Sequence, residues 1–306
     1  MNGEQKQETE KNKLPKVLLS CPTSSRHSHL LNDWIKHLNE LTYQNFDVLM
    51  IDTTLDNGLY FERLKKQKVH KKEIFVQKHE WDIKKTHPLQ MLANIREDIR
   101  LFFIENNYDY LFFLDDDIFI PKNGIQRLLS YNKDHVGFYV HVFYKPHRVP
   151  CILKSGDLIM GKGLEYYSFK EIEAYRSFIK KFKANKLTNE EKSFIPFLIK
   201  DKQFPHLFKS YAVNLGCLMI KRNVLEKCQF RTHPTFIWGE DLWYYAEAND
   251  KKFEFWCDSD IRAEHRNTEW NSIISKSPKQ MGFWIVKGPA DATGAEIVVR
   301  NKKVIT

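Results

Sequence analysis

Three consecutive aspartates, Asp115-Asp116-Asp117, directly follow the almost wholly apolar run 110–114. Short apolar runs of this kind are typical of buried strands in parallel sheets. A packed core would not hold three adjacent carboxylates, because each is costly to bury unpaired and they repel one another. At the carboxyl end of a strand, where open α/β sheets bind ligands, carboxylates can bind Mn²⁺ or Mg²⁺. A solvated acidic turn is the alternative, and the preceding apolar run favours the metal site.

The residues before this triplet alternate between strand-like and helix-like patterns. Apolar runs predict buried strands at 16–21, 46–51 and 73–77, and apolar positions at helical spacing predict helices at 30–41 and 89–105. This alternation predicts a doubly wound, mostly parallel α/β sheet with right-handed crossovers. The run that ends in the triplet is then one strand of that sheet, with its carboxylates at the edge where ligands bind.

The residues after the triplet continue the sheet. We predict helices at 124–131 and 240–249 and strands at 136–143, 211–221 and 253–257. Gly216 lies inside one of these strands, and a glycine there often marks the close approach of a ligand or another backbone. The helix at 240–249 begins with two acidic residues, which the helix dipole alone would favour.

The chain divides into a main domain and several appended segments. Residues 1–14 are predicted to be a disordered tail, 15–266 the α/β domain, and 267–306 a C-terminal extension with a strand or hairpin. Residues 156–210 are rich in lysine and helix-like, and we expect a helical insertion or lid there. We expect it on the acceptor side, where its basic run 180–186 could face lipid headgroups or an anionic acceptor. An ordinary solvated helix face is the alternative.

Composition places the chain among globular proteins. It has 306 residues, a hydrophobic content of 42% and a net charge of +9. This length fits one large α/β domain, and the charge favours a nucleotide diphosphate, an anionic membrane surface or nucleic acid as partner. The five cysteines are scattered without a CxxC pair, which is typical of a reducing compartment. With no apolar run long enough to span a bilayer, we expect a cytoplasmic protein that is at most peripheral to the membrane.

Four motifs in this order resemble the GT-A fold glycosyltransferases, and family 2 most closely. The matching residues are the turn Cys21-Pro22-Thr23 with Asp52, the triplet Asp115-Asp116-Asp117, the acidic helix start Gly239-Glu240-Asp241-Leu242, and His265. The resemblance covers residues 16 to about 266. Each motif is weak by itself, but four in the expected order and local structure form a more specific signal.

The resemblance implies a metal site for a nucleotide-sugar donor. Asp117 is expected to contact Mn²⁺ or Mg²⁺, and Asp115 to contact the ribose or to reach the metal through water. Asp116 belongs to the same donor-site motif but should point to the opposite side of the strand end and matter less. His265 would complete the metal shell or touch the diphosphate, although a lone histidine is more often structural. The cation would neutralise the charge of the departing nucleoside diphosphate.

The resemblance also implies a catalytic base on the acidic helix. Asp241 is expected to take the proton of the attacking acceptor hydroxyl, with inversion at the anomeric carbon, and Glu240 to orient or replace it. The alternative is that both acids only complement the helix dipole. Trp238 and Gly239 are expected on the acceptor side, where the tryptophan could stack on a sugar ring or belong to the core.

The nucleotide is expected at the ends of the first two strands. The candidates are Pro22, Thr23 and Asp52, the last as an acceptor for a base N–H, although an aspartate at such a turn is common for local reasons. Asn94 and Arg96 could reach the nucleotide or its phosphates. The segment after strand 46–51 is less acidic and less rich in Ser and Gly than the family pattern, which leaves the identity of the nucleotide open.

We therefore expect a metal-dependent, inverting, hexosyltransferase-type enzyme that moves a sugar from a UDP- or GDP-sugar to a glycan, lipid-linked or protein acceptor. A nucleotidyltransferase is an alternative, but the loop after the first strand contains no glycine to cradle a triphosphate. A two-metal nuclease or phosphatase could use the triplet but would not explain the acidic helix and the histidine. A non-catalytic nucleotide- or glycan-binding protein is a further alternative. Nucleic-acid binding is the weakest, because the lysines are dispersed.

Overall fold

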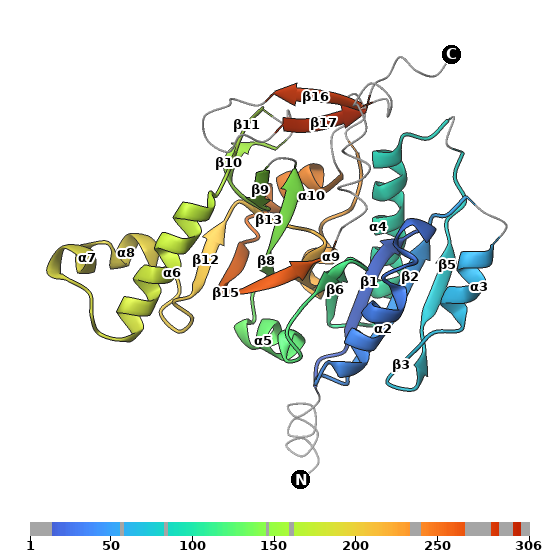
Figure 1. Ribbon diagram of the computed structural model, residues 1–306, viewed down its shortest axis with the longest axis horizontal. Helices are drawn as coiled ribbons and strands as arrows, with labels where there is room; N and C mark the ends of the chain where they lie inside the picture. Colours follow the sequence, from blue (N-terminus) through green and yellow to red (C-terminus); the bar gives the residue numbers. More distant parts are fainter. Residues whose placement is uncertain are drawn as a thin grey trace, which may run out of the picture.

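The computed structural model describes residues 14–55, 58–82, 85–144, 147–158, 162–232, 240–266, 283–287 and 296–300. A ten-stranded sheet runs through the molecule, and eight of its strands lie side by side in the order β12-β15-β8-β14-β6-β1-β2-β5 (Figure 1). In chain order these strands are β1 (Val17–Thr23), β2 (Phe46–Asp52), β5 (Phe75–Lys78), β6 (Tyr110–Leu114), β8 (His135–Tyr144), β12 (Leu207–Ser210), β14 (Cys217–Lys221) and β15 (Phe255–His265).

The sheet is mostly parallel, as the alternation of strands and helices predicted. Strand β1 pairs in parallel with both β2 and β6, β2 pairs in parallel with β5, and β15 with β8. Among the eight strands, the exceptions are β14, which runs antiparallel to β6 and β8, and β12, which runs antiparallel to β15. The two short strands of the sheet that lie outside this order also pair antiparallel. The carboxyl ends of β1, β2 and β6 therefore meet at one edge, beside the start of β14.

Helices cover both faces of the sheet and bury one hydrophobic cluster on each. Side chains of β1 alternate between the clusters, because successive residues of a strand point to opposite faces: Val17 and Leu19 belong to one and Leu18 to the other. The first cluster contains α2 (Leu31–Glu40) and α5 (Gly124–Tyr131). The second contains α4 (Pro88–Glu105), α9 (Arg222–Leu225) and α10 (Glu240–Asp250). All of the predicted helices that flank the sheet are present.

The predicted helical insertion at 156–210 begins with strands. Strand β10 (Ile152–Asp157) pairs with β11 (Lys162–Tyr166) and with β13 (Ala212–Val213) in a separate three-stranded sheet. Helix α6 (Phe169–Lys183) follows, and its first turn is fixed by a capping box between Ser168 and Glu171. Instead of one further helix there are two short ones, α7 (Asn189–Ser193) and α8 (Ile195–Leu198), because Pro196 cannot continue a helix from α7.

Other differences from the sequence-based prediction are local. The predicted strand 211–221 is divided into β13 and β14, with a turn at 214–216 between them. Strand β15 is longer than predicted and reaches His265 across a bulge between Asp258 and Arg262. Several short elements were not predicted from the sequence. They are η1 (Ser25–His27), α3 (Leu59–Lys65), α9, the small hairpin of β3 (Lys68–Val69) and β4 (Lys72–Glu73), and the strands β7 (Ile118–Phe119), β9 (His147–Pro150) and β12.

The C-terminal extension contains a hairpin of β16 (Phe283–Lys287) and β17 (Glu296–Arg300). The predicted tail at 1–14 lies outside the described residues except for its last residue. Among the described residues, no helix combines the length and the apolar character that crossing a membrane requires. All five cysteines are free thiols.

His135, at the start of β8, is fully buried and links stability to pH. Its Nε2 lies 2.8 Å from the Tyr244 hydroxyl, and its Nδ1 lies 3.2 Å from the backbone oxygen of Glu254. Burial lowers the pKa of His135 from 6.5 to about 3. The unfolded chain therefore takes up a proton below pH 6.5 that the folded chain excludes, so stability is lost as the pH falls from about 6.5 toward 3.

We expect this histidine to contribute up to about 1.4 kcal/mol per pH unit to the slope of the unfolding free energy in that interval. Denaturant unfolding at several pH values between about 4.5 and 7 measures the slope. His135→Gln should make it shallower, apart from any overall loss of stability, whereas the surface substitution His29→Gln should leave it unchanged. An equally steep slope in His135→Gln would contradict the assignment.

Candidate functional site

Asp117 and His265 lie together where β6 ends. Strand β7 pairs antiparallel with the end of β15, with Ile118 opposite His265, and this register brings the two side chains together. His265 Nε2 lies 3.1 Å from Asp117 Oδ2, and only 4% of Asp117 is exposed. Burial by itself would raise the pKa of Asp117, but the hydrogen bond and charge of His265 lower it below its usual value. The pair is therefore poised to keep a buried carboxylate ionised.

The geometry of this pair fits a divalent cation. Two neighbouring ligands of an octahedral ion, each about 2.1 Å from it, are roughly 3 Å apart. The separation of Asp117 Oδ2 and His265 Nε2 matches that spacing, so both atoms can bind one ion once their hydrogen bond is given up. Carboxylate oxygen and imidazole nitrogen are a donor set that Mn²⁺ accepts. Asp115 does not complete a compact three-ligand group with them in this arrangement.

Asp115 is held by its backbone and fits closely under a glycine. Its N–H donates to the oxygen of Gly216 at 2.9 Å, and its oxygen accepts from Trp34 Nε1 at 3.1 Å. A Cβ atom on Gly216 would lie 2.0 Å from Asp115 Oδ2. The predicted close approach at Gly216 is thus made by this carboxylate. Burial raises the pKa of Asp115 to about 6, against the opposing effect of Arg96.

A single methyl group at this glycine should disturb the site. Gly216→Ala places a Cβ where the Asp115 carboxylate lies, so we expect that carboxylate to move and nucleotide binding to weaken by about ten-fold or more. The fold should change less, because the displaced group is the end of a side chain. Titration calorimetry with a nucleoside diphosphate and Mn²⁺ measures the loss. The matched control is Gly58→Asn, at a turn where nothing lies within 4 Å of the added atom.

Asp116 points toward the first strand, away from Asp117. Its Oδ2 accepts a hydrogen bond from the Thr23 hydroxyl, and its Oδ1 lies 2.5 Å from His27 Nδ1. Only 2% of the residue is exposed. Burial would lower the pKa of His27, but Asp116 raises it to about 9. Asp116 and Thr23, both predicted to bind the donor, thus bind each other and fix the turn that contains η1.

Asp52 is fully buried at the end of β2. Its Oδ2 lies 2.8 Å from Lys78 Nζ, and its Oδ1 accepts from the backbone N–H of Thr54 at 2.9 Å. A nucleotide base would have to share this carboxylate with Lys78. Pro22 is half-buried in β1, beside Ile51 in the register of the two strands. Base binding by Asp52 and Pro22 therefore stays a prediction.

Arg96 and Glu240 form a buried ion pair between α4 and α10. The Nε atom of Arg96 lies 3.2 Å from Glu240 Oε1, and 8% and 5% of these residues are exposed. Arg96 also stacks on the Phe113 ring, with its guanidinium carbon 5.4 Å from the ring centroid. Asn94, which was predicted to act with Arg96, lies on the exposed side of α4 and accepts from Gln90.

The guanidinium of Arg96 connects this pair to the aspartate triplet. Burial would lower the pKa of Arg96, but the carboxylates of Glu240, Asp115 and Asp241 together raise it. Arg96 in turn is the main influence that lowers the pKa of Asp115 against burial. Arg96 therefore lies between the acidic start of α10, through its ion pair with Glu240, and the end of β6, through its contact with the Phe113 ring.

The two acids of α10 have different environments. Burial raises the pKa of Glu240 to about 7, although Arg96 opposes this. Burial also raises the pKa of Asp241, which is half-buried and accepts from the N–H of Leu242 at 2.8 Å. Asp241 has no cation within 4.0 Å among the described residues, whereas Glu240 has Arg96. Trp238 and Gly239, the predicted acceptor-side residues, lie outside the described residues.

Several residues of the site were not singled out from the sequence. They are His27, Trp34, Lys78 and Asn214. The Oδ1 atom of Asn214 would lie 3.0 Å from a Cβ atom added to Gly216. The partners of His27, Trp34 and Lys78 are 89, 81 and 26 positions away in sequence, so no local pattern marks these three residues. The polar residues that follow the first predicted strand are the one signal that could have pointed toward His27.

A second group of potential metal ligands was also missed. Atoms of His206, Asp258 and Asp260 lie within 4.8 Å of one another, the only such group among the described residues. Cations of the protein already neutralise it: Arg127 binds Asp258 at 2.5 Å, and Lys183 binds Asp260 at 3.1 Å. The Asp258 carboxylate also accepts from Tyr131 at 2.7 Å. These contacts make the group a structural network that joins α5 to the bulge of β15.

No protein-family model and no curated protein matches this chain. Solved structures do. The chain is similar to GalNAc-T7, crystallised with UDP, GalNAc and Mn²⁺, with 15% identity and a TM-score of 0.53 over 83% of this chain and 44% of that one.

It also matches S. aureus TarS, with 12% identity and a TM-score of 0.45 over 81% of this chain and 36% of that one. The 1–349 fragment of TarS gives the same identity and TM-score over 59% of its length. The chain thus spans less than two thirds of each of these structures.

Similarity at this level of identity establishes the fold. The sheet order, the strand-end triplet and the similarity to GalNAc-T7 together show that the chain has the GT-A fold of glycosyltransferases, as the sequence predicted.

Proposed function

We propose that this chain is a metal-dependent glycosyltransferase that uses a nucleotide-diphosphate sugar. The observation that carries the proposal is the pairing of Asp117 with His265 at the same edge of the sheet as the buried acids of α10. The GalNAc-T7 structure, which shares the fold, was solved with UDP and Mn²⁺. The sugar and the choice between UDP and GDP are not fixed by this observation.

In the proposed donor site, Asp117 and His265 would hold Mn²⁺ or Mg²⁺, and Asp115 would contact the ribose or act on the cation through water. The cation supplies electrostatic stabilisation of the negative charge that develops on the departing diphosphate. Pro22, Thr23 and Asp52 lie at the ends of β1 and β2, where the base and ribose are expected. Asp116 acts by holding the turn after β1 through Thr23 and His27.

In the proposed transfer step, Asp241 removes the proton of the acceptor hydroxyl. The oxygen forms a bond to the anomeric carbon as the bond from that carbon to the diphosphate oxygen breaks, and the nucleoside diphosphate leaves with the electron pair. A single displacement of this kind inverts the anomeric configuration. Asp241 suits this role better than Glu240, because it is less buried and has no ion pair with Arg96.

Glu240 and Arg96 are proposed to position the start of α10. Their ion pair crosses from α4 to the first residue of α10, so it fixes the direction in which Asp241 points. Arg96 also keeps positive charge near Asp115, which limits repulsion among the carboxylates of the site. On the acceptor side we propose Trp238 and Gly239, which precede α10, and as acceptor the hydroxyl of a glycan, a lipid-linked sugar or a protein.

A thermal-shift screen with UDP, GDP, CMP and dTDP, each with Mn²⁺ and with EDTA, tests the proposal. A ligand that binds only the folded chain raises the melting temperature. We expect one nucleoside diphosphate to raise it by several degrees with Mn²⁺ and to have little effect with EDTA. The absence of a metal-dependent shift for all four would favour a phosphoryl-transfer enzyme or a non-catalytic protein with this fold.

A further inference from the structure

Three large apolar side chains are exposed together at the turn between α7 and α8. Phe194, Phe197 and Leu198, here called the outer patch, are 49%, 71% and 37% exposed. The other large apolar side chains that are exposed among the described residues belong to separate elements. Helices α7 and α8 lie at one extremity of the molecule, beyond α6 and away from the main sheet (Figure 1).

The backbone directs the outer patch toward solvent. The N–H groups of Phe197 and Leu198 both lie 3.0 Å from the oxygen of Phe194, so these residues form one helical turn. Residues three and four positions apart in such a turn share a face. Ile199, which follows, is 6% exposed and packs inward. In this segment the two phenylalanines are therefore exposed to solvent, whereas the smaller Ile199 is buried.

This turn is held in place at both of its ends. A capping box joins Thr188 to Glu191 at the start of α7, and Lys181 of α6 binds Glu191 at 2.5 Å. After α8, Asp201 binds Lys133 at 2.5 Å. The exposure of the outer patch is therefore a property of an anchored element.

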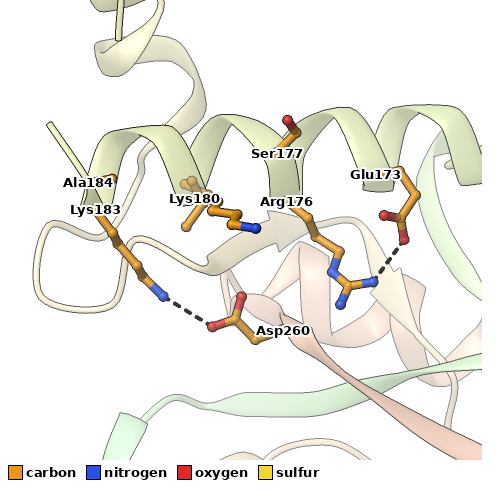
Figure 2. A pocket seen from close by; sticks show the side chains of 8 residues that line it. Glu173, Arg176, Ser177, Lys180, Lys183, Ala184 and Asp260 are labelled. Carbon is orange, nitrogen blue, oxygen red and sulfur yellow. Dashed lines mark hydrogen bonds and ion pairs between the residues drawn. The ribbon is translucent and has the colours of Figure 1, made fainter. Parts of the chain in front are cut away.

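Helix α6 is in turn fixed on the sheet. Its Ile172 and Ile179 are buried, and its Lys183 binds Asp260 of β15 at 3.1 Å. This ion pair lies beside a groove in which Arg176 pairs with Glu173 (Figure 2). Lys180, on the same groove, has no carboxylate within 4.0 Å among the described residues, and Figure 2 shows it without an ion pair.

Positive charge surrounds the outer patch. Residues 180–202 contain seven lysines and three acidic residues. Two of the three acids, Glu191 and Asp201, are neutralised by the ion pairs described above. Lys192, Lys200 and Lys202 flank the patch, are exposed, and have no carboxylate within 4.0 Å in the described part of the chain.

We propose that the outer patch and its lysines dock this protein on an anionic lipid bilayer. Aromatic side chains that project from a surface enter the interface between headgroups and acyl chains, and lysines around them are attracted to anionic headgroups. Each such lysine strengthens binding about five-fold near the surface at moderate salt. A protein groove could also receive the two phenylalanine rings, but it would not require the unpaired lysines that flank the patch in sequence.

Vesicle co-sedimentation tests the proposal. The full chain is mixed with phosphatidylcholine vesicles and with vesicles that also contain phosphatidylglycerol, at low and at physiological salt. We expect binding to the anionic vesicles that weakens with salt, and at least ten-fold weaker binding to the neutral ones. Phe194→Ser with Phe197→Ser should lower the partition coefficient about ten-fold or more. Adding Lys192→Glu, Lys200→Glu and Lys202→Glu should lower it further.

Matched substitutions at other surface positions show whether vesicle binding depends on the outer patch itself or only on the total apolar surface and net charge of the chain. Leu59→Ser with Leu101→Ser removes two apolar side chains that are 77% and 43% exposed. Lys36→Glu, Lys66→Glu and Lys71→Glu together change the net charge as much as the triple substitution around the patch does. Both controls should bind vesicles better than their counterparts in the outer patch, with melting temperatures measured for all variants.

Two results would overturn the proposal. One is equal vesicle binding by the patch variants and their controls, since the whole surface charge would then be responsible. The other is a concentration-dependent dimer of the wild-type chain that the two phenylalanine substitutions abolish, without any vesicle binding, since a second copy would then cover the patch. Because the assay uses no nucleotide, its outcome is independent of the proposed transferase activity.

Discussion

Asp117→Asn is expected to abolish the Mn²⁺-dependent binding of a nucleoside diphosphate. The substitution removes the charge of the carboxylate that His265 contacts at 3.1 Å, while the amide keeps its size and one oxygen. Loss of a residue that merely supports a metal ligand already costs about 10- to 100-fold in metal affinity, so loss of the ligand itself should cost more. A nucleotide at 100 times its Kd stabilises the wild-type chain by about 2.7 kcal/mol, and the variant should lose this stabilisation.

The experiment is a titration of Mn²⁺ in the presence of the nucleotide that the thermal-shift screen identifies. Asp260→Asn is the matched control, because Asp260 belongs to the only compact three-ligand group among the described residues. If the triplet holds the ion, Asp260→Asn should respond to Mn²⁺ like the wild type. Retention of the response in Asp117→Asn and its loss in Asp260→Asn would place the metal at His206 and refute the assignment.

Asp241→Asn is expected to leave donor binding intact and to lower transfer by about 10²- to 10⁴-fold. This range is the usual contribution of a positioned base that accepts a proton in the transition state. The side chain is half-buried, so the substitution should be tolerated by the fold. Transfer to the acceptor at saturating donor measures the loss, and donor binding by calorimetry serves as the internal control.

Comparison with Glu240→Gln identifies the base. If Glu240 only positions α10 through Arg96, Glu240→Gln should change KM and the stability of the fold. The fall of the transfer rate at low pH should then stay as it is in the wild type. A base must be ionised to act, so wild-type transfer should fall as the pH drops through the pKa of Asp241, which burial raises above its ordinary value. That acidic limb should disappear in Asp241→Asn. Full transfer by Asp241→Asn, with loss in Glu240→Gln, would move the role to Glu240.

Much of the fold could be predicted because its signals are local. The apolar run 110–114 and the helical periodicity of 89–105 each lie within one element, and both appear in the structure within one residue. Periodicity does not report which strands become neighbours. The pairing of β14 with β6 and β8 in antiparallel orientation was therefore not foreseen, since it depends on a turn at 214–216 that packs over Asp115.

The site was predictable as a set of motifs and not as a set of contacts. Asp117 and His265 are 148 positions apart, and their pairing follows from the register of β7 with β15. The contacts of Asp116 and Arg96 could not be read from the motifs, because one binds Thr23 and His27 and the other binds Glu240. Such roles depend on which buried groups need a partner, and that is decided only when the elements pack.

The long sequence interval between Asp117 and His265 has a consequence for synthesis of the chain. Strand β6 can pair with β1 on one edge as soon as it has been synthesised, because β1 precedes it in the chain. Its other edge has no partner until β14, which ends at Lys221, has been synthesised. His265 is translated 148 residues after Asp117, which at roughly 5–20 residues per second is about 7–30 s later. Until Lys221 has been added, the nascent chain has an open strand edge tipped with three acids. The pairing of β7 with β15, which brings His265 to Asp117, can form only after the chain has grown well beyond that point. We therefore expect this pairing to be a late step in the folding of residues 14–266.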